Sequence, residues 1–532
     1  MIGAGPGTEL LAFTSASGCR AWLANLPLAE SQQLQALLLR QLNLLADTAL
    51  PPGERAEILE LLRETIVLAQ TSCSRRFAGK LLPLAEAEQA AYQASLALWL
   101  ALEANYLLCL QENGQLPERT ALIAQRALSA MTWALQDDCR AGFLPSASYW
   151  RRLHGIYRAA ESLQLTHRPV ADKLRGHAST NVAAAYVEPL LIAAAQPFEL
   201  TPRQLDLVAR WAQRWSGKVL ILAVAPPDAP PGTRPNVPLL TVDLAGEQPV
   251  LFKPIRNDGA LLRWLDPAKL RKSLKVRLAA LADGVSPELL QLGKDCVQPT
   301  CAELLKQVYL IWCKGGPLTP RRTSRNASCQ LVGGIAAIHY QLSGEAFRQP
   351  AGPARLNKQE LDEIATFGSI AARRRDGDGE QYALEVWQLA EEDSAGLRLV
   401  RPLSQPGMRL GNGHLVAVHS DGAQGFLLGI VRAVMVDTDA GCVAALLRFL
   451  PGKPTAVALR GTGVTAANEM FRPGLRLPAV PQLNEPASVL MPSGCFRPGR
   501  IVETYSDHSR TIRLSHLLER GADFERADFE WQ

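Results

Sequence analysis

The spacing of apolar residues changes once along this chain, and that change constrains the fold more than any other feature. From about residue 21 to 165, apolar residues recur every three or four positions, and breakers such as Pro51-Pro52 separate the runs. This period predicts about five or six amphipathic helices. Beyond Pro317 the apolar residues form short runs between glycine-rich turns, which predicts antiparallel β-strands. A helical part is therefore followed by a β part.

A single hydrophobic core cannot account for 532 residues, because domains usually hold about 100–200 residues. The sequence predicts an α+β multidomain protein with an N-terminal all-α helical bundle, a small α/β middle region and a C-terminal antiparallel β-barrel with a β extension. The predicted boundaries are 1–200 for the helical bundle, 201–316 for the α/β linker domain, 317–463 for the barrel with an insertion at 356–380, and 464–532 for the β extension.

Several elements are predicted inside these domains. The middle region should contain helices at about 266–281 and 302–312. In the barrel, the apolar runs 415–418 and 426–432 flank a Ser-Asp-Gly turn and predict a β-hairpin. In the β extension, a short helix is predicted at 514–520.

Composition and charge exclude several classes of protein. Apolar residues make up 47% and charged residues 20%, which is typical of a globular chain. The net charge of +5 creates no overall field for nucleic acid or membrane, so neither is expected as a partner. The most apolar run, 94–110, contains Glu103 and Asn105 and falls short of the ~20 residues that cross a bilayer, so we expect a buried helix and no membrane insertion. The opening MIGAGPGTEL has no basic segment before an apolar stretch, which predicts a cytoplasmic protein.

No catalytic or metal centre is predicted. The ten cysteines form no CxxC pair, and most are expected to be reduced core residues. The eight histidines form no HExxH or comparable ligand pattern. No nucleophile, base and orienting group can be assembled from the motifs, so the sequence predicts a protein that is not an enzyme and has no metal or cofactor.

Three arginines lie close together just before the first predicted barrel strand. Arg321, Arg322 and Arg325 belong to the run Pro-Arg-Arg-Thr-Ser-Arg, which follows Gly315-Gly316-Pro317. Planar guanidinium groups pair with phosphate or with the O6/N7 edge of guanine. Taken alone, such a run is also typical of a solvated basic turn.

This arginine run resembles the opening RxxxR loop of the PilZ family, whose barrels bind cyclic di-GMP. A second family motif, Asp/Asn-x-Ser-x-x-Gly, is similar to the run from Glu392 to Leu397. Ser394 matches that motif, whereas Glu392 replaces Asp or Asn, and Leu397 replaces the final glycine, with Gly396 one residue earlier. The resemblance covers about residues 317–460 and implies a PilZ-like barrel.

The resemblance implies a cyclic di-GMP-binding effector or sensor whose domain arrangement changes when the ligand binds. The ligand-binding residues that it implies are Arg321, Arg322, Arg325, Glu392, Ser394 and Gly396. The two departures in the second motif keep an alternative open: a ligand-free PilZ-like scaffold or chaperone-like adaptor that acts through protein–protein contacts. In either case we expect a protein partner, which the sequence does not identify.

Overall fold

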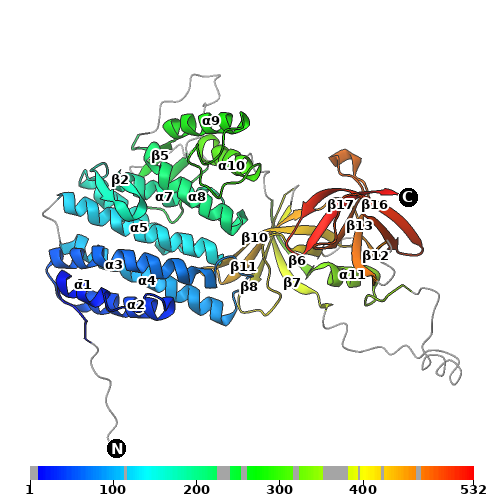
Figure 1. Ribbon diagram of the computed structural model, residues 1–532, viewed down its shortest axis with the longest axis horizontal. Coiled ribbons are helices and arrows are strands. Elements are labelled where there is room, and N and C mark those ends of the chain that lie inside the picture. The colour runs from blue at the N-terminus through cyan, green and yellow to red at the C-terminus, as the bar shows by residue number, and fades with distance from the viewer. Residues whose placement is uncertain are drawn as a thin grey trace, which may run out of the picture. The chain divides into compact units, whose positions relative to one another are not determined.

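The protein divides into a helical unit and a β unit. The computed structural model describes residues 10–112, 117–224, 240–252, 261–315, 323–350, 382–393, 396–420, 425–462 and 469–532. The first compact unit is Met1–Thr319 with Met435–Ala440, and the second is Pro320–Val434 with Gly441–Gln532. Helices dominate the first unit and strands the second (Figure 1). The change of pattern along the sequence thus corresponds to a change of architecture.

The helices of the first unit confirm the predicted helical bundle. They are α1 (Ala16–Leu23), α2 (Ser31–Asp47), α3 (Pro52–Cys73), α4 (Glu86–Glu112), α5 (Pro117–Ala141), α6 (Ala147–Ser162), α7 (Val182–Ala194), α8 (Pro202–Trp215), α9 (Ala268–Ala282) and α10 (Thr300–Lys314). Local chemistry sets several of their starts. Ser15 Oγ accepts a hydrogen bond from Gly18 N at 3.2 Å and caps α1. Helix α3 begins with Pro52, and proline is favoured at this position because the first N–H of a helix has no intrahelical partner.

In the described part of the first unit, two small sheets accompany these helices. The strands are β1 (Val170–Asp172), β2 (His177–Thr180), β3 (Leu220–Leu222), β4 (Leu240–Asp243) and β5 (Leu262–Asp266). Strands β1 and β2 form an antiparallel pair inside the segment for which the sequence predicts only helices. The other three form an antiparallel sheet in the order β3-β5-β4, which, with α9 and α10, makes up the predicted α/β middle region.

One apolar cluster extends from the bundle into the middle region. Leu98 of α4, Leu190 of α7 and Leu305 of α10 all belong to it and are fully buried. The guanidinium of Arg63 also donates to both carboxylate oxygens of Asp172, at 3.0 and 2.9 Å, inside this unit. The helical bundle and the α/β region therefore share a core.

Among the described helices, only α4 is both long enough and apolar enough to cross a membrane by length and composition. Its segment Glu86–Leu110 has the length and mean hydropathy, 1.3, of a membrane-spanning helix, and half of its most apolar window is buried inside the unit. Trp99, Leu102 and Tyr106 lie in the apolar cluster, and the Tyr106 hydroxyl donates to Glu60 Oε1 at 2.8 Å. These contacts favour a core helix of a globular protein.

The first barrel of the second unit contains six antiparallel strands. They are β6 (Thr323–Gly333), β7 (Glu385–Glu392), β8 (Gly396–Pro402), β9 (Leu415–Ser420), β10 (Leu427–Asp437) and β11 (Cys442–Phe449), and helix α11 (Ile335–Ser343) follows β6. The barrel closes in the order β10-β11-β8-β7-β6-β9. The pairing of Leu428 with Ala417 confirms the predicted hairpin. The insertion predicted at 356–380 lies outside the described residues.

The predicted β extension proves to be part of a second closed barrel. Its strands are β12 (Thr455–Gly461), β13 (Arg472–Leu477), β14 (Ser488–Pro492), β15 (Ile501–Tyr505), β16 (Ser509–Arg520) and β17 (Phe524–Trp531), closed in the order β12-β13-β14-β17-β16-β15. The helix predicted at 514–520 is wrong, because these residues belong to β16. Pairing with both β15 and β17, and the alternation of buried Ile512 and Leu514 with exposed Arg513, override the local helical preference.

The two barrels share an apolar cluster centred on α11. Ile335 and Ile338 of this helix pack with Leu428 of the first barrel and with Leu475 and Phe524 of the second. All five side chains are buried. The second unit is therefore one packed body in which α11 fills the space between the barrels.

Candidate functional site

Three strand ends of the first barrel bring together the described part of the predicted binding site. Arg325 lies on β6, Glu392 is the last residue of β7, and Gly396 is the first residue of β8. Glu392 pairs with Thr323 across one ladder and with Leu397 across the other. Arg321, Arg322 and Ser394 lie outside the described residues. The structure thus places three of the six predicted residues at one end of the barrel.

An exposed ion pair links two of these residues. Arg325 Nε donates to Glu392 Oε2 at 3.1 Å, and the two side chains are 56% and 40% exposed. The register between β6 and β7 shifts between Ser324 and Ala327, so Arg325 lies in a bulge. A bulge changes the direction of a side chain at a strand end. Because the pair is solvated, an anionic ligand can displace the Glu392 carboxylate at little cost.

Gly396 is required by the packing of the barrel. Asp393 N donates to Gly396 O at 3.0 Å, and Gly396 N donates to Asp393 Oδ1 at 2.9 Å, which closes the turn between β7 and β8. A Cβ atom at position 396 would lie 1.8 Å from the Leu447 carbonyl oxygen of β11. Leu397, which stands at the family's glycine position, is buried in the barrel. The absence of a side chain at position 396 therefore allows the backbones of β8 and β11 to approach closely at this end of the barrel.

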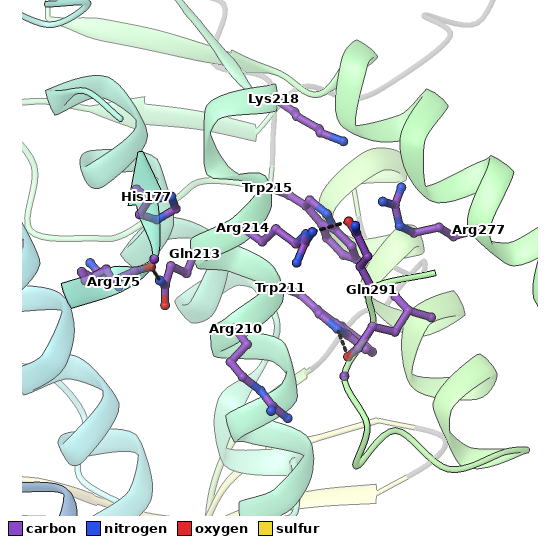
Figure 2. Close-up of a pocket in the computed structure, with 13 residues that line it drawn as sticks. Arg175, His177, Arg210, Trp211, Gln213, Arg214, Trp215, Lys218, Arg277 and Gln291 are labelled. Atoms are coloured by element: carbon purple, nitrogen blue, oxygen red, sulfur yellow. Dashed lines mark hydrogen bonds between the residues drawn. The ribbon is translucent and has the colours of Figure 1, made fainter. Parts of the chain in front are cut away.

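A second place in the molecule concentrates positive charge. A cavity of about 730 Å³ in the first unit is lined by residues of α8 and α9, by the segment 175–177 and by the loops after α8 and before α10, and none of the described lining residues is acidic. Figure 2 shows basic side chains from several elements around it. The basic residues are Arg175, His177, Arg210, Arg214, Lys218 and Arg277.

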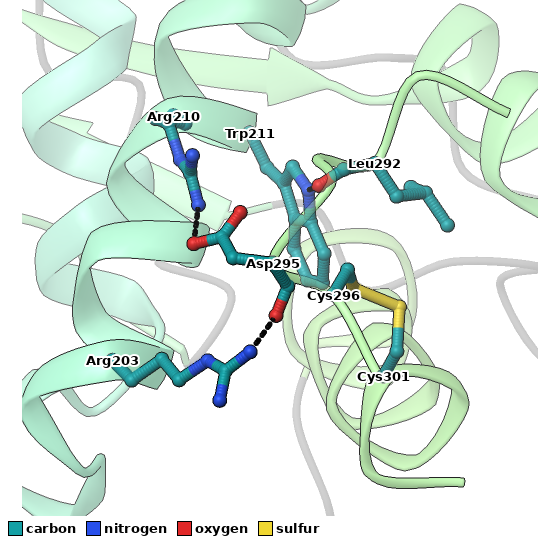
Figure 3. Close-up of a disulfide and its surroundings, with 7 residues drawn as sticks. All are labelled: Arg203, Arg210, Trp211, Leu292, Asp295, Cys296 and Cys301. Carbon is teal, nitrogen blue, oxygen red and sulfur yellow. Dashed lines mark hydrogen bonds and ion pairs between the residues drawn. A yellow bond between two sulfur atoms is a disulfide. The ribbon is translucent and has the colours of Figure 1, made fainter. Parts of the chain in front are cut away.

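Hydrogen bonds and a disulfide hold one wall of this cavity in place (Figure 3). Trp211 Nε1 donates to Leu292 O at 2.9 Å, and Arg210 forms an ion pair of 2.6 Å with Asp295. The next residue, Cys296, is bonded to Cys301 at the start of α10. The other eight cysteines, all among the described residues, form no disulfide, which agrees with the expectation that most of the ten are reduced. The sequence gives no CxxC signal because four residues separate the two thiols.

The charges around the cavity act on one another. Burial, and then the charges of Arg277 and Arg214, lowers the pKa of the Lys218 ammonium. Burial, and then Arg214, lowers the pKa of the Arg277 guanidinium. Burial and the neighbouring Arg175 also lower the pKa of His177, so its ring is neutral at pH 7. Like charges held together in this way are typical of sites that bind an anion.

The sequence does not predict this cavity, although it contains part of the signal. Arg210 and Arg214 are four residues apart, a spacing that places two side chains on one face of a helix, and Lys218 lies another four residues along the chain. Arg277 is separated from them by about sixty residues of sequence and reaches the cavity only through the packing of α9. Across the described residues, no group of three or more His, Cys, Asp and Glu side chains could hold a metal ion.

Comparison with known proteins identifies both ends of the chain. Residues 17–227, in the helical unit, match the family model of the N-terminal domain of the cyclic-di-GMP receptor FimW. Residues 457–532, which contain most of the second barrel, match the FimW C-terminal beta-barrel domain. No curated protein matches the chain. The first barrel lies between the two matched segments, and together these segments identify the chain as similar, at both its ends, to one cyclic-di-GMP receptor family.

Proposed function

We propose that this protein is a cyclic di-GMP effector that binds its ligand at the end of the first barrel where β6, β7 and β8 meet. The observation that carries the proposal is the match of both chain ends to a cyclic-di-GMP receptor family. Two features of the first barrel support the location: its closed six-stranded form, and the proximity of Arg325, Glu392 and Gly396. The barrel is of PilZ type in this proposal.

The proposed residues have complementary tasks. Arg321, Arg322 and Arg325 pair with the phosphates and with the O6/N7 edges of the guanines. Arg325 leaves Glu392 to do so, and the released carboxylate accepts hydrogen bonds from guanine N–H groups. Ser394 adds a hydroxyl contact, and Gly396 keeps β8 close to β11 and holds the turn beside Glu392 through its hydrogen bonds with Asp393. Binding requires no covalent step.

Ligand binding would also change the arrangement of the two units. Residues 316–322 connect α10 to β6 in the sequence and contain Arg321 and Arg322. Ligand contacts to these arginines therefore restrict one of the segments that join the units. This link between site and connector supports an effector whose output is a change in domain arrangement.

Calorimetric titration of the full-length protein with cyclic di-GMP tests the proposal. We expect micromolar or tighter binding by the wild type, and a loss of about tenfold or more in the Arg321→Ala/Arg325→Ala variant because charge-assisted hydrogen bonds to phosphate disappear. Arg513→Ala, an exposed arginine on β16, is the matched control and should bind normally. Absence of binding by a folded wild type would contradict the function, and unchanged binding by the double variant would contradict the site.

A further inference from the structure

Three cations of the cavity in the first unit have only neutral hydrogen-bond partners among the described residues. Lys218 Nζ donates to Ser273 Oγ at 2.7 Å, and Arg277 Nη1 donates to the same oxygen at 2.7 Å. Arg214 donates to the side-chain oxygen of Gln291. No described carboxylate forms an ion pair with any of the three. Their charges therefore remain uncompensated inside the cavity.

The other arginines of the cavity are neutralised. Arg175 forms a buried ion pair with Glu188, and Arg210 pairs with Asp295. The fold thus supplies a carboxylate partner at two positions and omits one at the three neighbouring positions. Because Lys218 and Arg277 are half-buried, water screens their repulsion only partly. An uncompensated cluster of this kind costs stability, which an anion bound between the cations would restore.

The cavity has a rigid floor beside these cations. The Arg277 guanidinium lies over the Trp215 ring, 5.3 Å from its centroid, which holds this side chain in position. Trp215 is buried, and its indole N–H has no hydrogen-bond partner among the residues that the structure describes. The adjoining part of the wall, around Trp211, is held by the bond from its indole N–H to Leu292 O and by the nearby disulfide (Figures 2 and 3). A preformed cavity of about 730 Å³ has the size of a small-molecule site.

We propose that this cavity is a second anion site, which binds a small molecule carrying a pyrophosphate or two neighbouring phosphate groups through Arg214, Lys218 and Arg277. Three cations match the charge of two linked phosphates, and guanidinium forks and an ammonium are the usual protein ligands of phosphate oxygens. The site lies within one unit and requires no residue of the first barrel. It is therefore independent of the cyclic di-GMP site proposed above.

Calorimetric titration of the full-length protein with inorganic pyrophosphate tests this site. We expect the wild type to bind, Lys218→Met and Arg214→Gln each to weaken binding about tenfold or more, and Lys275→Gln to bind as the wild type does. Lys275 is an exposed lysine of α9 that does not line the cavity. A folded wild type that does not bind pyrophosphate, or variants that bind it equally well, would overturn the proposal.

Two further titrations separate this proposal from the barrel site. Arg321→Ala/Arg325→Ala should keep its affinity for pyrophosphate, and Lys218→Met should keep its affinity for cyclic di-GMP. If pyrophosphate binding were lost in the barrel double variant instead, the phosphate site would be in the barrel and the cavity proposal would fail. If Lys218→Met lost both ligands, the cavity would be confirmed as a phosphate site, and the barrel would be excluded as the place where cyclic di-GMP binds.

Discussion

At the scale of single residues, Gly396 is a position where the backbones of β8 and β11 leave no room for a side chain. A Cβ there would lie 1.8 Å from the Leu447 carbonyl oxygen, so β8 and β11 would have to separate. We expect Gly396→Ala to lower the free energy of unfolding by about 2 kcal/mol, measured by chemical denaturation. Gly429→Ala on β10 is the control, because its nearest contact would be an ordinary 3.5 Å from Arg448 O. Equal losses in the two variants would contradict the role assigned to Gly396.

A buried acid in the helical unit predicts a pH dependence of stability. Burial raises the pKa of Asp138 to about 7, and the Tyr92 hydroxyl donates to its Oδ1 at 2.8 Å. The native state therefore holds a proton on this side chain that the unfolded state releases near its usual pKa of 3.8. The contribution of Asp138 to the free energy of unfolding is therefore fully present below pH 3.8 and is lost as the pH rises towards 7.

The Asp138→Asn variant isolates this contribution, because the amide oxygen can still accept from Tyr92. Between pH 5 and pH 7, the wild type should lose about 2 kcal/mol of unfolding free energy relative to the variant, measured by denaturation at both pH values. Parallel pH profiles for the two proteins would show that Asp138 does not titrate in this range.

At the scale of elements, the start of α8 predicts a specific loss of stability. Thr201 and Gln204 form a capping box, in which Thr201 Oγ1 accepts from Gln204 N at 3.3 Å and Gln204 Oε1 accepts from Thr201 N at 2.9 Å. Thr201→Ala should reduce the unfolding free energy by about 1 kcal/mol, measured by urea denaturation, and Thr201→Ser should retain most of it. A Thr201→Ala variant with the same unfolding free energy as the wild type would mean that packing alone fixes the start of α8.

The sequence predicts single helices and strands better than it predicts how the strands close into barrels. Periodicity identified the helices and the β9–β10 hairpin, because those signals are local. The sequence predicts only an extension in place of the second barrel, because the pairs that close this barrel join β12 to β15 and β14 to β17, which lie far apart in the chain. The cavity was missed for the same reason: Lys218 and Arg277 meet only after α9 has packed. Arg325 and Glu392, in contrast, were found from a motif and do form a contact.

At the scale of the whole molecule, the apolar cluster around α11 makes the two barrels interdependent. A chain that ends at residue 452 would lose Leu475, Leu490 and Phe524 and would expose the apolar face of Ile338 and Leu428. We expect such a chain to bind a hydrophobic dye and to aggregate, measured by dye fluorescence and size-exclusion chromatography, whereas residues 320–532 should remain monomeric. A soluble shortened chain without dye binding would show that the first barrel folds independently.

Closure of both barrels also restricts how other proteins can recognise the second unit. In an open sheet, the outer strands present free N–H and C=O groups to which a partner's strand can add. In the described barrels, each strand from β6 to β17 has two strand neighbours, so no edge strand remains for such addition. A partner protein must therefore bind this unit through side chains and turns rather than through strand backbone. The same closure protects twelve consecutive strands from pairing between copies of the chain.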